Sequence, residues 1–229
     1  MEKKTSLKSI GIILDGNRRW ARERGMHTLE GHRRGFENLK NITKFIAETD
    51  IEDMAVYAFS TENWNRSPEE VAYLMDLFVE LFSSIDEIKR SGVKIKVVGK
   101  KTLFSKKLQE LIANAEDETK NNKNLTLWIA LSYGGRLELS EAARVLIEKT
   151  NKSQIITEEL FKSFMWSAEL PDFDILIRTG GEHRLSNFFP WQSAYAELFF
   201  EKKYWPEFSI DDLKNIFDKY KKRHRRFGK

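Results

Sequence analysis

The chain has 229 residues, of which 41% are hydrophobic and 32% charged, a composition typical of a globular protein. It has no cysteine, which excludes disulfide bonds and thiolate metal sites and makes a reducing, cytoplasmic setting the simplest expectation. The net charge of +4 is too small to indicate nucleic-acid binding, but it suits an anionic substrate. Residues 1–9 are expected to form an arm that leads into the first strand, because the apolar run that follows them is too short to span a membrane.

Short apolar runs alternate with helical patterns along the chain. The expected strands are Ile10–Leu14, Met54–Phe59, Val93–Val98, Leu125–Leu131, Asp174–Ile177 and Ala196–Phe200. The expected helices are 31–48, 68–90, 104–121, 136–150, 157–166 and 209–226. Several strands are continuously apolar, as strands buried on both faces are. The alternation predicts a single α/β domain over residues 1–229, with a mostly parallel central sheet of about six strands surrounded by helices.

The first expected strand ends in the sequence GIILDGNRRWAR. Asp15 follows the strand, Gly16 permits a sharp turn, and Arg18 and Arg19 precede a helical pattern. Helix amides and two arginines favour an anion, whereas Asp15 would repel one unless a hard cation such as Mg²⁺ lies between them. An aspartate helix cap with two surface arginines explains the same residues equally well. The sequence has no glycine-rich nucleotide-binding motif.

Polar residues also follow the second expected strand. The sequence FSTENWNRSPEE places several polar side chains and Trp64 on one loop, where function tends to lie, although capping of the next helix explains these residues as well. The sequence GHRRG places His32 at the expected start of a helix. The helix from Pro68 is apolar over more than one narrow stripe, so it is either a core helix or the wall of an elongated apolar cavity.

The fifth expected strand leads into a second cationic segment, RTGGEHRLSNF. Arg178, Arg184 and Ser186 could together hold one diphosphate, because arginine pairs with phosphate in a fork geometry. His183 and Glu197 could be metal ligands, although their spacing is not that of a familiar zinc site. The basic C-terminal sequence YKKRHRRFGK is expected to be a solvated tail, because it lacks the interleaved aromatic residues of a single-strand nucleic-acid binder.

Seven motifs occur in order from about Ile10 to Gly228: DGNRRWA, GH, FSTENWNR, YGGR, IRTGGEHRLSNF, WQSAYAEL and RRFG. Together they resemble the cis-prenyltransferases, in particular the bacterial undecaprenyl diphosphate synthase type. The resemblance implies a parallel sheet with an elongated hydrophobic tunnel, a homodimer, and a requirement for Mg²⁺. It also implies condensation of isopentenyl diphosphate onto farnesyl diphosphate, with new cis double bonds, to a long polyprenyl diphosphate that serves as a lipid carrier precursor for cell-wall synthesis.

Two alternatives stay open within this resemblance: a non-catalytic partner subunit of the same fold, and a medium-chain cis-prenyl diphosphate synthase. The family's partners are the two diphosphate substrates and a second copy of the chain, not nucleic acid. Its location is cytoplasmic, with transient contact at the inner membrane face for product release.

The resemblance also implies roles for individual residues. Asp15 matches the metal-binding aspartate, and Asn63 matches the position at which a proton acceptor is often assigned. His183 and Glu197 match further metal-linked positions, with Glu197 reaching across the dimer. The matching substrate-binding positions are Gly16, Asn17, Arg18, Arg19, Trp20, Thr28, His32, Ser60, Thr61, Glu62, Trp64, Arg66, Arg178, Arg184, Leu185 and Ser186.

Three positions depart from the family's pattern. Arg18 stands where many bacterial members have glycine, although other members carry arginine. Thr28 stands where a phosphate-contacting arginine is common, and Arg24 is a candidate substitute for it. Trp128 replaces a small polar residue, and it either narrows the cavity or fills the core.

Overall fold

The structure, a computed structural model, describes residues 7–151 and 153–222. Its six strands form one sheet in the order β3-β4-β2-β1-β5-β6, and every neighbouring pair is parallel. The strands are β1 (Ser9–Ile13), β2 (Asp53–Ser60), β3 (Val93–Val98), β4 (Leu125–Tyr133), β5 (Ile175–Arg178) and β6 (Glu197–Phe200). This sheet confirms the predicted α/β fold, and each strand lies within two residues of its predicted bounds.

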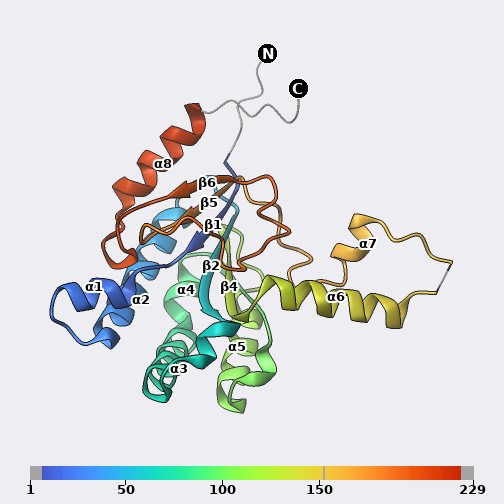
Figure 1. The fold of residues 1–229 in the computed structure, drawn as a ribbon, viewed down its shortest axis with the longest axis horizontal. Coiled ribbons are helices and arrows are strands. Elements are labelled where there is room, and N and C mark those ends of the chain that lie inside the picture. The colour runs from blue at the N-terminus through green and yellow to red at the C-terminus, as the bar shows by residue number, and fades with distance from the viewer. Residues whose placement is uncertain (1–6, 152, 223–229) are drawn as a thin grey trace.

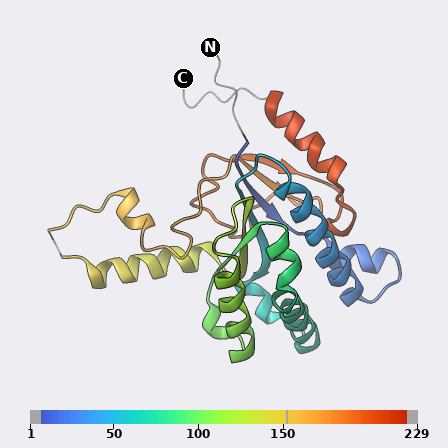
Figure 2. The same ribbon diagram turned by 180° about the vertical axis from the view of Figure 1, so that it is seen from behind.

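The helices connect these strands. They are α1 (Asn17–Glu23), α2 (Thr28–Ala47), α3 (Pro68–Ser83), α4 (Ile85–Arg90), α5 (Lys106–Thr119), α6 (Gly135–Lys149), α7 (Glu158–Lys162) and α8 (Ile210–Lys222), with 3₁₀ turns at η1 (Thr61–Asn65), η2 (Lys101–Leu103) and η3 (Trp205–Glu207). Figures 1 and 2 show that α6 and α7 project away from the body that the sheet and the other helices form. Within the described residues, none of these helices combines the length and apolarity that crossing a bilayer requires.

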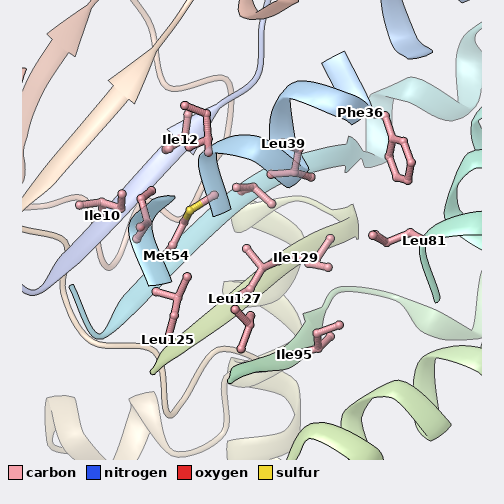
Figure 3. Packing of buried hydrophobic residues seen from close by; sticks show 14 of the residues in the cluster. Ile10, Ile12, Phe36, Leu39, Met54, Leu81, Ile95, Leu125, Leu127 and Ile129 are labelled. Carbon is pink, nitrogen blue, oxygen red and sulfur yellow. The ribbon is translucent and has the colours of Figure 1, made fainter. Parts of the chain in front are cut away.

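The two faces of the sheet are covered differently. Helices α2, α3, α5 and α8 pack on one face over a cluster that includes Ile10, Ile12, Met54 and Ile129 (Figure 3). The opposite face is covered mainly by irregular segments, whose aromatic residues pack on the alternate strand residues; this second cluster contains Ile13, Ala55, Val98, Trp128, Ala130, Tyr133, Leu170, Phe173, Leu176, Phe188 and Phe189. Burial on both faces explains why the strands are continuously apolar.

Three predicted helix boundaries are wrong. The expected 68–90 helix is broken, because α3 ends at Ser83 and a separate α4 follows; serine is a weak helix former. The helix expected from residue 31 begins at Thr28, so His32 lies inside α2 rather than at its start. The helix expected over 157–166 is the short α7, which is capped by the Thr157 side chain.

The sequence also predicts an N-terminal arm and a C-terminal helix. The arm expected over residues 1–9 is shorter by at least one residue, because Ser9 already pairs in β1. Residues 1–6, the end of the helix expected over 209–226, and the RRFG motif lie outside the described residues.

Candidate functional site

Three predicted site segments meet at one edge of the sheet. β1 lies between β2 and β5, and the register sets Ile13 beside Tyr57 on one side and Arg178 on the other. Because parallel strands end at the same edge, the segments that follow them converge there, which is the usual ligand position in open α/β sheets. Asp15 follows β1, η1 follows β2, and Arg178 ends β5.

Asp15 is the centre of an ion-pair network that joins both predicted anion-binding segments. Its Oδ2 accepts a hydrogen bond from Arg178 Nη2 at 2.8 Å, and its Oδ1 lies 3.0 Å from Arg19 Nη2. Arg178, whose side chain is 5% exposed, also donates from Nη1 to the Arg184 carbonyl at 2.6 Å and to Ser186 Oγ at 2.8 Å. Residues 163 positions apart in the chain are thus held in direct contact.

The local backbone explains why Asp15 faces these arginines. Gly16 is the N-cap of α1 and has a φ of 108°, in the left-handed region. A Cβ atom there would lie 2.5 Å from the Tyr204 ring, so the position requires glycine. No side chain caps α1, so the alternative interpretation of Asp15 as a helix cap is wrong.

The first of two cavities at this edge has a volume of about 420 Å³ and lies between β1, α1, α2 and α3. Its polar lining residues are Asp15, Asn17, Arg18, Arg19, Arg22, His32, Asn63 and Arg66. Its apolar lining includes Phe36, Leu39, Leu74, Leu77, Phe78 and Trp205. Helix α3 therefore packs in the core and also contributes apolar side chains to the wall of this cavity, so the two interpretations of its sequence hold together.

The second cavity, of about 930 Å³, is lined by Ile13, Leu14, Asp15, Tyr57, Ser60, Glu62, Asn63, Arg66, Arg136, Leu139, Arg178, Arg184, Leu185, Ser186, Asn187 and Pro190. Five of these residues also line the first cavity: Leu14, Asp15, Tyr57, Asn63 and Arg66. The two cavities therefore meet at Asp15 and Asn63.

Glu62, in the lining of the second cavity, has a lowered pKa. Burial alone would raise this pKa, but hydrogen bonds from its own backbone and from Ser60 and Thr61 lower it.

Glu70 organises the cations of the first cavity, although it lines neither cavity itself. Its buried Oε1 lies 2.9 Å from His32 Nε2 and 3.0 Å from Arg66 Nη1, and its Oε2 lies 3.7 Å from Arg18 Nε. Burial would raise the pKa of Glu70, but the His32 hydrogen bond and the neighbouring positive charges lower it. Burial lowers the pKa of His32, so the imidazole is neutral and donates from Nε2 to the carboxylate.

Two charged residues at the first cavity were not predicted, Glu70 and Arg22. Glu70 follows Arg66 by four residues, and Arg22 follows Arg18 by four. Residues four apart in a helical pattern share a face, so this spacing was the available signal. In the structure, Arg66 precedes α3, and its side chain forms an ion pair with Glu70 in the first turn of that helix.

Several predicted site residues line neither cavity in this chain: Trp20, Thr28, Thr61, Trp64, His183 and Glu197. Trp64 Nε1 donates to Ser132 Oγ at 2.9 Å, and the His183 ring stacks on Phe200 with centroids 4.8 Å apart. Arg24 pairs with Glu207, lies over the Trp20 ring and is not among the lining residues of either cavity; its substitution for the arginine absent at Thr28 stays a prediction. In the described residues, no group of three or more histidine or acidic side chains is arranged to hold a metal.

Trp128 fills core and does not narrow the first cavity. Its side chain belongs to the cluster on the opposite face of the sheet and is 4% exposed. Its Nε1 donates to Asp53 Oδ1 at 2.7 Å, which satisfies the buried indole.

Comparison with known proteins assigns the family. A family model described as putative undecaprenyl diphosphate synthase matches residues 13–228. The isoprenyl transferase of Thermotoga maritima is 42% identical over 96% of this chain and 95% of its own length, and that of Rickettsia bellii is 42% identical over 98% and 99%.

Two solved structures agree with this assignment. Lavandulyl diphosphate synthase from Lavandula x intermedia, in complex with dimethylallyl diphosphate, has a TM-score of 0.92 at 34% identity and covers 97% of this chain and 98% of its own. A probable undecaprenyl diphosphate synthase from Campylobacter jejuni has a TM-score of 0.82 at 29% identity and covers 98% and 100%. The predicted resemblance is thus confirmed over nearly the whole chain, and this chain belongs to the undecaprenyl diphosphate synthase family of prenyltransferases.

Proposed function

We propose that this protein, as a single domain, condenses isopentenyl diphosphate onto an allylic diphosphate, farnesyl diphosphate first, with new cis double bonds. Repeated additions give a long polyprenyl diphosphate, undecaprenyl diphosphate being the expected product and a lipid carrier precursor for cell-wall synthesis. One observation carries the proposal: two arginine-lined cavities meet at Asp15, and the first is also lined by the apolar side chains Phe36 and Leu39 of α2 and Leu74, Leu77 and Phe78 of α3. Two anionic substrates, one with a long hydrocarbon tail, fit this arrangement.

The first cavity suits the allylic substrate. Its diphosphate would bind near Asn17, Arg18 and Arg19, and its hydrocarbon would lie against Leu74 and Leu77 of α3. Each methylene that leaves water contributes about 0.8 kcal/mol, so these apolar side chains favour a prenyl tail over a bare diphosphate. The volume of about 420 Å³ lies in the range of small-molecule sites, roughly 300–1,000 Å³.

The second cavity suits isopentenyl diphosphate. Arg178, Arg184 and Ser186 lie at its lining and would hold the diphosphate, while the five-carbon group would point toward the residues that both cavities share. The double bond would then face the allylic carbon. Holding two reactants in a fixed relative orientation is a large part of the rate enhancement of such a reaction.

Asp15 fits a magnesium ion, because it is a hard oxygen donor at the junction of two diphosphate sites and its side chain is 27% exposed. A bound Mg²⁺ would be held by Asp15 together with substrate phosphate oxygens and would neutralise charge on the leaving diphosphate. Arg19 and Arg178 balance the Asp15 charge in the structure. Arg19 would also stabilise the diphosphate as it departs. His183 and Glu197 stay predictions as further metal-linked residues.

Asn63 would position the reactants rather than accept the proton. Its Oδ1 accepts a hydrogen bond from the Ser60 amide at 3.0 Å, which fixes the orientation of the side chain at the junction of the cavities. An amide is a very weak base, so the proton lost from the isopentenyl group would pass to the departing diphosphate or to water.

The proposal includes a cytoplasmic homodimer, with Glu197 reaching across the dimer, and transient contact with the inner membrane face for product release. The alternative of a non-catalytic partner subunit is disfavoured, because the ion pairs that join Asp15 to Arg19 and Arg178 are intact. The alternative of a medium-chain synthase differs only in product length.

Radiolabelled isopentenyl diphosphate, incubated with farnesyl diphosphate and Mg²⁺ and followed by product chromatography, tests the proposal. We expect label in long-chain products that depend on both the allylic substrate and Mg²⁺. A folded protein that incorporates no label would refute the enzymatic function. Label confined to medium-chain products would replace undecaprenyl diphosphate by the medium-chain alternative.

A further inference from the structure

We propose that Arg136 is a further diphosphate-binding residue of the second cavity, an assignment that rests on the proposed function. Arg136 is the second residue of α6, is exposed, and lines the second cavity together with Arg178 and Arg184. Arg136 is the last residue of the YGGR motif, for which the sequence predicts no individual role.

The backbone at Arg136 is fixed next to the diphosphate-binding segment. The Gly135 amide donates to the Asn187 carbonyl at 2.8 Å, and the Arg136 amide donates to Asn187 Oδ1 at 2.8 Å. A Cβ atom at Gly135 would lie 2.1 Å from Pro190 Cδ, so α6 approaches this loop as closely as glycine allows. Because Ser186 directly precedes Asn187, the Arg136 side chain starts beside a predicted diphosphate contact.

The charges that line the second cavity make Arg136 distinct. Each of the other three arginines already has a carboxylate partner: Arg66 pairs with Glu70 at 3.0 Å, Arg178 with Asp15 at 2.8 Å, and Arg184 with Glu182 at 2.6 Å. Among the residues that the structure describes, the Arg136 guanidinium has no hydrogen-bond or ion-pair partner. It is therefore the lining cation that can receive an anion without giving up an existing ion pair.

A structural role does not explain this arginine. The N-terminal end of a helix carries a partial positive charge, so a cation in the first turn of α6 is unfavourable. Arg144, on the same helix, is instead paired with Glu141 at 2.9 Å and with Glu148 at 2.7 Å. An unpaired arginine at an unfavourable helix position, facing a cavity built for an anion, fits binding better than folding.

The chemistry points to the isopentenyl diphosphate rather than the allylic one, because Arg136 lines the second cavity and not the first. A guanidinium binds phosphate oxygens through parallel N–H donors, and such charge-assisted hydrogen bonds are about twice as strong as neutral ones. Arg178 uses both of its terminal nitrogens within the protein. The Arg136 guanidinium would therefore supply the further N–H donors that bind the multiply charged diphosphate.

The test compares Arg136→Gln and Arg136→Lys with Arg144→Gln, a matched loss of one arginine from the same helix. For Arg136→Gln, we expect the KM for isopentenyl diphosphate to rise about tenfold, equivalent to about 1.4 kcal/mol, with the KM for farnesyl diphosphate unchanged. The KM of Arg136→Lys for isopentenyl diphosphate should lie between those of the wild type and Arg136→Gln, because lysine keeps the positive charge but lacks the paired N–H donors of the guanidinium. Titration calorimetry with inorganic pyrophosphate should show the same order of affinities, and the Tm of Arg136→Gln should not fall.

The outcomes separate this proposal from the proposed function. If wild-type protein turns over and Arg136→Gln behaves as Arg144→Gln does, the assignment of Arg136 is wrong while the function stands. An equal rise in both KM values would also overturn the assignment, because it would indicate a general effect of charge or folding. Absence of turnover and of pyrophosphate binding in folded wild-type protein would refute the function, and the assignment with it.

Discussion

Replacing Glu70 by glutamine tests whether a buried carboxylate outside both cavities controls the first one. Glu70→Gln keeps the shape of the side chain and removes its charge. Arg66 and Arg18, at 3.0 and 3.7 Å, then lose their counter-ion, and the neutral His32 imidazole, at 2.9 Å, loses a charged hydrogen-bond acceptor. All three line the first cavity, so their positions, and not only the stability of the fold, depend on Glu70.

The expected cost follows from the burial of these groups. Leaving one partner of a fully buried ion pair alone costs about 3–5 kcal/mol. Here the side chains of Arg18 and Arg66 are 42% and 26% exposed, so water can solvate part of their charge. The glutamine oxygen also still accepts one hydrogen bond, so we expect about 2 kcal/mol. For a domain of 150–250 residues, this lowers the Tm by about 4–8 °C.

Thermal unfolding and steady-state kinetics together check this expectation. The KM for the allylic diphosphate should rise more than that for isopentenyl diphosphate, because Arg18 and His32 line only the first cavity and Arg66 lines both. Glu69→Gln is the matched control, since Glu69 is the adjacent residue of α3 and is exposed. A Glu70→Gln variant with the Tm and both KM values of Glu69→Gln would refute the reasoning.

Three further outcomes are expected. Asp15→Asn should lower turnover by about 10²–10³-fold, more than it lowers the Tm, because it removes the charge at the junction of the cavities; near-full activity would contradict its assignment as metal ligand. Burial lowers the pKa of His32 below its ordinary 6.5, so on acidification the unfolded chain takes up the His32 proton at a higher pH than the folded chain does. The free energy of unfolding should therefore decrease as the pH falls below 6.5. His32→Gln should flatten this part of the pH profile of the Tm, and an unchanged profile would exclude His32 as its source. Leu77→Trp should shorten the prenyl chain of the products, as measured by chromatography, because Leu77 is one of the apolar side chains that line the first cavity. Products of unchanged length would show that the prenyl chain does not grow in this cavity.

The fold was predictable because its signals are local. Each strand is a short apolar run followed by a polar turn, so all six were found within two residues of their bounds. The helix boundaries that were predicted wrongly depend on single side chains. The break between α3 and α4 falls at Ser83 and Ser84, within a pattern that otherwise continues to be helical. Such a pattern shows which face is apolar, but it does not show where the backbone stops.

The site was predictable as a set of segments and less so as a set of contacts. The ends of β1, β2 and β5 were expected to carry function, and the structure brings Asp15, Asn63 and Arg178 together there. Which arginine pairs with which carboxylate depends on distances across the sheet, and the chain order contains no such information. The pairing of Asp15 with Arg178, and the lack of a side-chain partner for Arg136 among the described residues, therefore emerged only from the structure.

Trp128 shows most clearly what a strand sequence leaves open. In a half-buried strand, the polar residues mark the outer face, but Thr126 is the only polar residue of Leu125–Leu131 and the other six residues are buried, so the pattern marks the outer face only weakly. The register settles the question, because Ile129 faces the helices and Trp128, its neighbour, must then face the opposite side. The first cavity lies on the helix side, between β1 and helices α1 to α3. If the prenyl chain grows in the first cavity, as the proposed function has it, the side chains of α2 and α3 set its room, and Trp128 does not line that cavity.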